Sequence, residues 1–307
     1  MDKRTLGKSN LKVSKMGLGC MSLGTDETHA RRIIEAALEE GINYFDTADL
    51  YDFGENEKLV GKTLNSIREE VIIATKVGNR WNDAKDGWRW DPSKDYIKEA
   101  VKDSLKRLHV EYIDLYQLHG GTIEDPIDET IEAFEELKSE GYIKQYGISS
   151  IRPNVITEYV KKSSISSVMM QYSILDRRPE EMMTLLEENK ISVVTRGPLA
   201  KGLLSDKGLD KATEKIKEEG YLSYSFHELE ELLSSLKEKM LSHRSMTELA
   251  IQYNLSHPAV AAVVPGASSV EQVKENAKAA KADQLNFEEV ELIKHLSKFT
   301  KYEQHRS

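Results

Sequence analysis

The feature that most constrains the fold is a regular alternation of short apolar runs with longer helical patterns along the 307 residues. Eight runs are rich in β-branched and other apolar residues, and each has the length of a buried strand. These predicted strands are 16–19, 42–45, 71–74, 113–116, 145–148, 167–170, 192–195 and 260–264. The helical patterns between them predict crossover connections, because neighbouring parallel strands need a long connection that is usually a helix.

Eight helices are expected at 27–38, 56–64, 94–108, 127–138, 153–160, 180–187, 246–253 and 269–280. Eight strand–helix units use the whole chain and predict a closed (β/α)8 TIM barrel, whereas a doubly wound sheet usually needs only about five or six strands. An N-terminal β-hairpin is expected around Gly7–Asn10, and extra helices are expected at 212–219, 227–240 and 287–297. Since no Pro/Ser-rich linker interrupts the pattern, we expect one domain over 1–307.

Composition excludes several classes of function. The formal charge is −9 and there is no basic tract, which is a poor electrostatic match for nucleic acid or an anionic membrane. Cys20 is the one cysteine, so an internal disulfide or a multi-cysteine zinc site is excluded, and we expect no metal. No apolar run approaches the ~20 residues that cross a bilayer, and the N-terminus lacks an apolar signal core. We therefore expect a cytoplasmic protein; the sequence gives no oligomeric state.

Polar residues follow three successive predicted strands at the point where each strand ends. Asp46 and Tyr51 follow the second strand, Lys76 the third and His119 the fourth. In a (β/α)8 barrel these ends meet on one face, where active sites lie. Taken alone, a strand-end lysine is usually a solvated rim residue, and a lone tyrosine or histidine is usually structural.

Together these residue types suit one another chemically. An ammonium near a phenol favours the phenolate and lowers the phenol pKa from ~10 toward a range useful for proton transfer. A carboxylate beside the ammonium keeps it charged, and a histidine can position a carbonyl oxygen or relay a proton. Such a set can protonate an oxygen, but it supplies neither a strong nucleophile nor a metal site.

The local sequences at these positions resemble the aldo-keto reductase superfamily, in particular its bacterial and potassium-channel-β-like branch. The likeness runs from about residue 4 to residue 280, and all four catalytic positions are present. The matching segments are 17–24, 45–61, 74–76, 114–119, 147–150, 197–204 and 264–276. The resemblance implies NADPH-dependent reduction of aldehydes or ketones to alcohols by hydride transfer. It makes Tyr51 the general acid, lets Lys76 paired with Asp46 increase the acidity of that phenol, and lets His119 orient the substrate oxygen.

The resemblance also implies a set of cofactor contacts, most of them in loops that follow strands. They are Gly19, Cys20 and Met21 in the first loop, Asp46, Ser149, Ser150, Gln171 and Arg196 near the nicotinamide, Gly197, Leu199, Lys201 and Gly202 along the pyrophosphate, and Gly266, Ser268, Gln272, Glu275 and Asn276 at the adenosine end.

Three positions depart from the family pattern. Arg196 stands where relatives usually stack an aromatic ring under the nicotinamide, although a guanidinium can stack or pair with phosphate. Ser150 replaces an asparagine. Residues 266–269 lack the lysine or arginine that NADP-preferring relatives commonly carry beside the adenosine phosphate. We expect NADPH, with NADH as the alternative.

All three tryptophans, Trp81, Trp88 and Trp90, fall within ten residues after the third predicted strand. They form either a self-packed loop or an apolar lid over the open face of the barrel, suited to aromatic or aliphatic carbonyl substrates. A different class of function also stays open. Because Arg196 replaces the stacking ring, the chain could be a nucleotide-holding sensor or partner subunit that turns over slowly.

Overall fold

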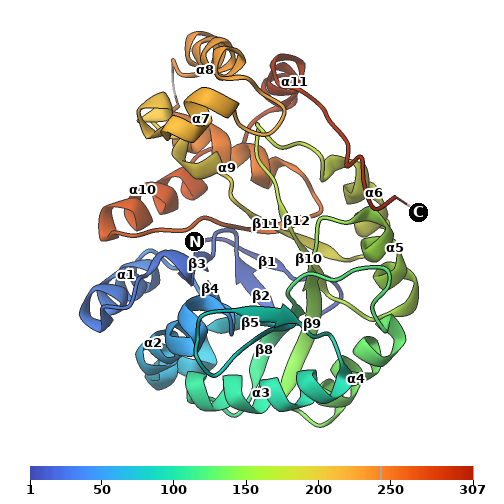
Figure 1. The fold of residues 1–307 in the computed structure, drawn as a ribbon. Helices are drawn as coiled ribbons and strands as arrows, with labels where there is room; N and C mark the ends of the chain where they lie inside the picture. The colour runs from blue at the N-terminus through green and yellow to red at the C-terminus, as the bar shows by residue number, and fades with distance from the viewer. Residues whose placement is uncertain (243, 307) are drawn as a thin grey trace.

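The predicted (β/α)8 barrel is confirmed in the computed structural model, which describes residues 1–242 and 244–306 (Figure 1). Eight parallel strands run in the spatial order β12-β11-β10-β9-β8-β5-β4-β3. Bridges from Met16 to Val263 and from Gly19 to Gly266 join the two outer strands, so the barrel is nearly closed. The strands are β3 (Leu18–Gly19), β4 (Tyr44–Asp46), β5 (Ile72–Val77), β8 (Ile113–Leu118), β9 (Ile143–Ser149), β10 (Ser167–Gln171), β11 (Ser192–Arg196) and β12 (Val260–Val264).

The helices that surround the barrel lie within a few residues of their expected bounds. They are α1 (Glu27–Glu39), α2 (Glu55–Leu64), α3 (Lys94–Leu108), α4 (Ile127–Ser139), α5 (Pro153–Lys162), α6 (Glu180–Glu188), α9 (Met246–Ser256) and α10 (Val270–Lys281). Several begin at a side-chain cap: the oxygens of Asp26, Ser93 and Ser269 accept hydrogen bonds from backbone N–H groups of α1, α3 and α10. The apolar faces of these helices pack against the outside of the sheet in one large core.

The predicted N-terminal hairpin is present as β1 (Lys3–Thr5) and β2 (Lys12–Ser14). Its residues Leu6 and Val13 are fully buried against side chains of the barrel interior. Gly7 has φ +56°, and a Cβ there would lie 2.2 Å from the Ser166 oxygen, so the turn needs glycine both for its backbone angle and for its space.

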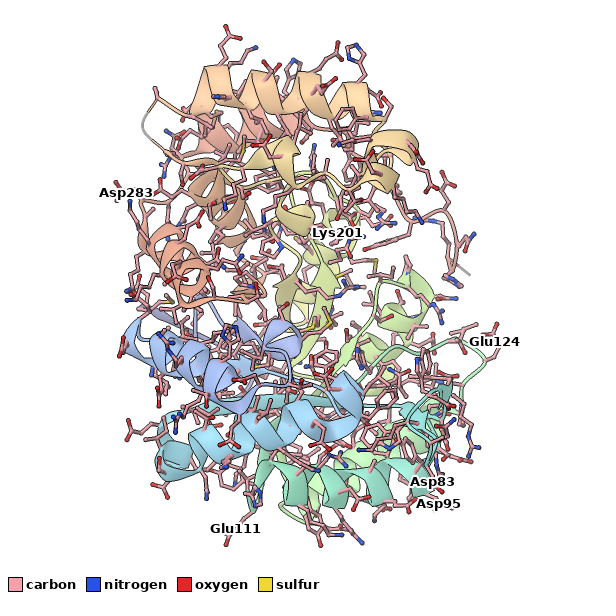
Figure 2. All side chains as sticks on the ribbon, turned by 60° about the vertical axis from the view of Figure 1, so that its left-hand side comes forward. Asp83, Asp95, Glu111, Glu124, Lys201 and Asp283 are labelled. Atoms are coloured by element: carbon pink, nitrogen blue, oxygen red, sulfur yellow. The ribbon has the colours of Figure 1, made fainter. Side chains whose placement is uncertain are left out.

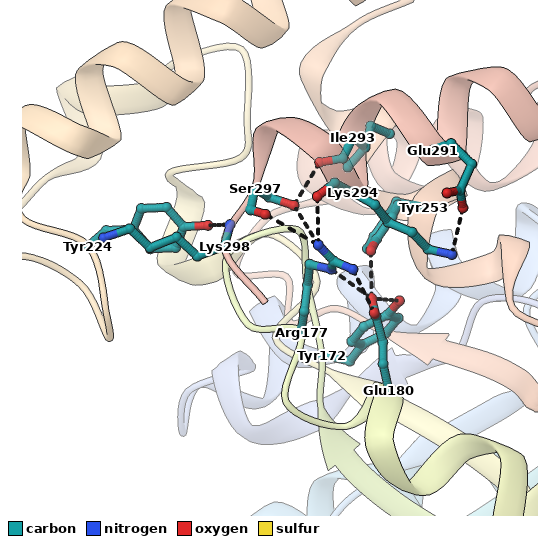
Figure 3. Close-up of polar contacts among 10 residues, drawn as sticks. All are labelled: Tyr172, Arg177, Glu180, Tyr224, Tyr253, Glu291, Ile293, Lys294, Ser297 and Lys298. Atoms are coloured by element: carbon teal, nitrogen blue, oxygen red, sulfur yellow. Dashed lines mark hydrogen bonds and ion pairs between the residues drawn. The ribbon is translucent and has the colours of Figure 1, made fainter. Parts of the chain in front are cut away.

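The expected extra helices form a layer of their own, α7 (Glu214–Glu219), α8 (Phe226–Met240) and α11 (Phe287–Leu296), which lie together in Figure 1. Figure 3 shows how the end of α11 is joined to the barrel. The buried Arg177 guanidinium donates to the carbonyl oxygens of Lys294 and Ser297 and forms an ion pair with Glu180. Glu180 also accepts from the Tyr253 hydroxyl at 2.6 Å, so one carboxylate connects α6, α9 and α11.

One structured segment was not predicted. Where we expected only a loop after the third strand, the chain forms an antiparallel hairpin, β6 (Asn79–Trp81) and β7 (Trp88–Trp90), with Trp81 opposite Trp88. Each strand has three residues and the turn between them is polar, so the alternation is too short to be read from the sequence. None of the helices in the described part of the chain combines the length and apolar character that a bilayer crossing needs.

Candidate active site

The structure brings Asp46, Lys76 and Tyr51 together at the carboxyl ends of β4 and β5. The Lys76 ammonium donates to Asp46 Oδ1 at 2.6 Å and to the Thr47 carbonyl oxygen at 2.7 Å. Its third donor faces the Tyr51 hydroxyl oxygen at 3.4 Å. Only 1% of the Lys76 side chain is exposed. The ammonium is therefore held at a fixed place beside the phenol.

The electrostatics of this group keep Lys76 charged. Burial acts to lower the pKa of Lys76, but the Asp46 carboxylate outweighs that effect and the net shift is upward. Gln117 supports the other carboxylate oxygen, since its Nε2 donates to Asp46 Oδ2 at 3.4 Å. Gln117 was not predicted as a site residue. It lies two residues before His119, on a strand in which every residue is buried.

Tyr51 stands at the start of an unusual turn. It begins the 3-10 segment Tyr51–Gly54, in which Asp52, Phe53 and Gly54 have φ of 48°, 50° and 86°. Left-handed conformations are costly for side-chain-bearing residues and persist only where the surroundings impose them. Here the chain is fixed on both sides of the turn, because Thr47 Oγ1 donates to Asn56 Oδ1 at 2.7 Å.

His119 follows the end of β8 and completes the group. Its ring meets the Tyr51 ring edge to face, with 5.9 Å between centroids. Burial, aided by the positive charges of Lys76 and Arg196, lowers the pKa of His119 to about 3. The imidazole is therefore neutral near pH 7 and acts as a hydrogen-bonding group; its Nδ1 has no partner among the described residues.

A cavity of about 400 Å³ adjoins this group through His119, whereas Asp46, Tyr51 and Lys76 are not among its lining residues. Its lining combines aromatic, apolar and cationic residues: Asn79, Trp88, Trp90, His119, Gly120, Gly121, Thr122, Ser149, Ser150, Ile151, Arg152, Met169 and Arg196. Trp90 is fixed by a hydrogen bond from its Nε1 to Asp125 Oδ1 at 2.9 Å. Asn79 and Arg152 were missed by the sequence analysis, since the first lies in the unpredicted hairpin and the second in a connecting loop.

The three tryptophans have different neighbours. Trp88 and Trp90 line the cavity, and Trp88 is 56% exposed. Trp81 lies against other residues: its ring meets Phe53 edge to face at 6.1 Å, and the Arg107 guanidinium lies 5.1 Å from its centroid. Of the predicted substrate contacts, Trp88 and Trp90 are placed where an apolar lid would need them.

Arg196 ends β11 beside Gln171, which ends β10. The guanidinium donates to Gln171 Oε1 at 2.9 Å, and Gln171 Nε2 donates to Asp176 Oδ2 at 3.1 Å. Asp176 in turn accepts two hydrogen bonds from Arg178, each of 2.7 Å. This chain of contacts fixes the orientation of the Gln171 amide at the edge of the cavity.

Most of the remaining predicted cofactor residues lie at strand ends or in the segments that follow them, and Gln272, Glu275 and Asn276 lie in α10. Ser149, Gln171 and Arg196 are the last residues of β9, β10 and β11, and Gly19, the last of β3, donates from its N–H to the Pro265 oxygen just after β12. The others are Cys20, Met21, Ser150, Gly197, Leu199, Lys201, Gly202, Gly266, Ser268, Gln272, Glu275 and Asn276, and of these Lys201 is exposed and labelled in Figure 2.

The predicted adenosine end lies at the N-terminus of α10. Ser269 caps the helix, and both the N–H and the hydroxyl of Ser268 donate to Gln272 Oε1. His29 of α1, which the sequence analysis missed, contacts the Ser268 oxygen through Nε2 at 2.9 Å. Its position on a solvent-facing helix end gives no signal in the sequence.

The Cys20 thiol lies in the core of the protein. Cys20 is fully buried, and burial raises the pKa of its thiol, so a reactive thiolate is disfavoured. Across residues 1–242 and 244–306, no group of three or more His, Cys, Asp or Glu side chains could hold a metal ion.

The chain is similar in sequence and in fold to known proteins. Residues 15–298 match the sequence model of the Aldo/keto reductase family. The chain is 60% identical over 307 residues, 100% of both chains, to a Bacillus subtilis (strain 168) protein named uncharacterized oxidoreductase YqkF. It is similar in structure to aldo-keto reductase AKR11C1 from Bacillus halodurans in its holo form, with a TM-score of 0.95, 60% identity and 100% of each chain covered. It is also 35% identical over 226 residues to the NADH-specific methylglyoxal reductase of Escherichia coli (strain K12), covering 67% of this chain and 69% of the relative.

Proposed function

The chain belongs to the aldo/keto reductase family and is an NAD(P)H-dependent oxidoreductase, and from that premise we propose that it reduces aldehydes or ketones to alcohols with NADPH, using Tyr51 as the general acid. The observation that carries the proposal is the position of the Lys76 ammonium, 2.6 Å from an Asp46 oxygen and 3.4 Å from the Tyr51 oxygen. An ammonium at that place stabilises the negative charge that develops on the phenol oxygen as its proton leaves.

The roles of the other residues follow from their positions. A bound nicotinamide cofactor supplies the hydride. Tyr51 supplies the proton to the carbonyl oxygen, and the neutral His119 ring offers a hydrogen bond that orients the same oxygen. Trp88 and Trp90 give the cavity an apolar side that suits the remainder of an aromatic or aliphatic substrate.

The chain offers a donor set that fits an extended dinucleotide. Ser149 lines the cavity and Gln171 lies beside the lining residue Arg196, so a hydroxyl and an amide are near the place where a nicotinamide carboxamide would need partners. Arg196 can lie flat against the nicotinamide or pair with phosphate. Residues 197–202 follow Arg196 and would lie along the pyrophosphate, and free N–H groups at the α10 N-terminus favour an adenosine-side phosphate.

The preference for NADPH rests on Ser268, Gln272 and the first turn of α10, which can bind a 2′-phosphate without a lysine or arginine in that loop. NADH is the alternative, and one relative is named as NADH-specific. Titrating each cofactor while following tryptophan fluorescence tests the preference, since Trp88 and Trp90 line the cavity. Tighter binding of NADPH supports the proposal, and equal or tighter binding of NADH contradicts it.

A second candidate function is favoured by Arg196. A guanidinium in place of a stacked aromatic ring changes the contact with the nicotinamide, and a protein that holds nucleotide but turns over slowly would tolerate that change. Repeated turnovers on a panel of methylglyoxal, an aromatic aldehyde and an aliphatic aldehyde would exclude the sensor role. Tight binding of NADPH with negligible turnover on the whole panel would favour it.

The direct test of the proposed reaction is Tyr51→Phe. Removing the hydroxyl removes the proton donor but keeps the ring that packs against His119, so kcat should fall by about 10²–10⁴-fold while NADPH still binds. The measurement is NADPH oxidation with the aldehyde panel, together with the dissociation constant of NADPH. A variant with the wild-type kcat would end the role assigned to Tyr51.

A further inference from the structure

A second buried charged group lies next to the residues described above, one position along β5 from Lys76. Glu57, in the first turn of α2, is fully buried and joins two elements. Its Oε1 accepts from the Thr75 hydroxyl at 2.6 Å, and its Oε2 accepts from Arg107 Nε at 2.6 Å. Thr75 directly precedes Lys76 on β5, so this carboxylate ties α2 to the strand that carries the ammonium.

Arg107, in the last turn of α3, holds the other side of the Tyr51 turn. A Cβ added to Gly54 would lie 2.6 Å from Arg107 Cδ and 3.1 Å from the Trp81 ring, so Arg107 and Trp81 pack directly on the glycine backbone. Trp81 also meets Phe53 edge to face. The left-handed residues Phe53 and Gly54 are therefore enclosed by Arg107 and by the indole that it covers.

Arg107 supplies the positive charge that balances the buried carboxylates of this group. Burial, with the nearby Glu57 carboxylate adding to it, raises the pKa of Asp49 well above its usual range. Arg107 is the cation that forms an ion pair with Glu57, and its positive charge also acts on Asp49. A buried carboxylate that loses its cation either takes up a proton or draws in water, and both changes displace its neighbours.

We propose that Arg107 is a positioning residue for the Tyr51–Lys76 pair, holding the Tyr51 turn through Gly54 and Trp81 and holding the Lys76 strand through Glu57 and Thr75. The inference rests on the proposed role of Tyr51. The side-chain contacts of Arg107 are with Glu57, Ser104, Gly54 and Trp81, so it acts on the reaction through these neighbours. A displacement of about 1 Å at a reacting group can cost about 10²-fold in rate, and the Tyr51–Lys76 contact is the longest of the three that Lys76 makes.

Three variants test the proposal. Arg107→Met keeps the length of the stem but removes the charge and the donors, Arg107→Lys restores the charge, and Thr75→Val removes only the hydroxyl that binds Glu57. We expect kcat to fall by about 10- to 100-fold in Arg107→Met, to recover most of that loss in Arg107→Lys, and to fall by a smaller factor in Thr75→Val. The NADPH dissociation constant, measured by calorimetry, should stay within about twofold, since no Arg107 contact reaches the cofactor residues.

A matched control separates positioning from stability. Arg68 forms another buried arginine–carboxylate pair, with Asp114, and lies away from the cavity. Arg68→Met should lower the melting temperature but leave kcat unchanged. The solvent deuterium isotope effect on kcat gives a further readout: it should change in Arg107→Met, where transfer of the Tyr51 proton is impaired, and stay unchanged in Arg68→Met.

The outcomes distinguish this inference from the function on which it rests. Wild-type kcat and isotope effect in a folded Arg107→Met, beside an inactive Tyr51→Phe, would overturn the positioning role and leave the proposed function standing. Wild-type kcat in Tyr51→Phe would instead overturn the proposed function. If Arg107→Met does not fold, Arg107→Lys and Thr75→Val decide: wild-type kcat in both would overturn the proposal, and a loss in Thr75→Val with NADPH binding intact would support it.

Discussion

Each end of the barrel contains a buried ion pair between a cation and an aspartate. The two pairs differ in the groups to which their other hydrogen bonds are made. At the carboxyl end of the strands, Lys76 pairs with Asp46 at 2.6 Å. At the amino end, Arg68 pairs with Asp114, also at 2.6 Å. Asp114 is near the start of β8, whereas His119 follows its end, so one strand separates a structural pair from the catalytic group.

The amino-end pair is completed by backbone groups. Arg68 donates to the carbonyl oxygens of Val71 and Tyr112, and Asp114 accepts from the Ile73 N–H at 2.9 Å. These contacts fix the entry of the chain into β5 and β8. Lys76 also donates to a backbone oxygen, but its last donor faces the hydroxyl of Tyr51. The same kind of buried pair therefore holds the backbone at one end and faces the proposed proton donor at the other.

The largest expected effects come from removing the cation of each pair in turn. Lys76→Met should lower kcat by about 10³-fold or more, because the charge that stabilises the Tyr51 oxygen is lost. Arg68→Met should leave kcat unchanged but cost about 3–5 kcal/mol of the free energy of unfolding, since it leaves the Asp114 carboxylate buried without its cation. Urea unfolding and NADPH oxidation, measured on both variants, test the division. Equal losses of kcat in the two variants would contradict it.

The pH dependence of stability sharpens the comparison. His119 has its folded pKa lowered to about 3 by burial and by Lys76 and Arg196, below the ~6.5 of an unfolded histidine. The contribution of the neutral ring to the free energy of unfolding is therefore fully present above pH ~6.5. It is lost at up to about 1.4 kcal/mol per pH unit as the pH falls toward 3. His119→Asn should reduce the acid sensitivity of the free energy of unfolding between pH 6 and 4. Parallel curves for the variant and the wild type would show that the pKa of His119 is not lowered in the folded protein.

The smallest expected effect concerns the edge of the cavity. Trp88 is mostly exposed, so Trp88→Ala should leave the free energy of unfolding within about 0.5 kcal/mol of the wild type. It should raise the KM for an apolar aldehyde several-fold with little change in kcat, because apolar contact area is lost on the substrate side. Kinetics with an aliphatic aldehyde and with methylglyoxal make the check, the smaller substrate serving as the control. A similar rise in KM for both aldehydes would show that Trp88 does not contact the apolar part of the substrate.

The barrel and the four polar residues at its strand ends could be predicted because both follow from local patterns in the sequence. Apolar runs of strand length recur in order, and the residues that follow them must meet at one end of a parallel barrel. The spacing of Asp46, Tyr51, Lys76 and His119 at those strand ends was therefore enough to bring them together before any distance was known.

The network behind the site could not be predicted, because its contacts join residues far apart in the chain. Glu57 meets Thr75 across 18 positions and Arg107 across 50. On a helix, Glu57 and Arg107 each read as ordinary solvated charges, and only the packing of α2 against α3 buries them. The place of Trp81 is of the same kind, since its contacts with Gly54 and Arg107 join residues far apart in the chain.

The most direct test of the account is a single-turnover measurement of NADPH oxidation in Tyr51→Phe, with the cofactor bound at saturation and an aldehyde in excess. The account predicts a rate at least about 100-fold below that of the wild type, with an unchanged NADPH dissociation constant. A rate within about twofold of the wild type would show that the proton comes from another group, and the assignment of Tyr51, Lys76 and Asp46 would be wrong.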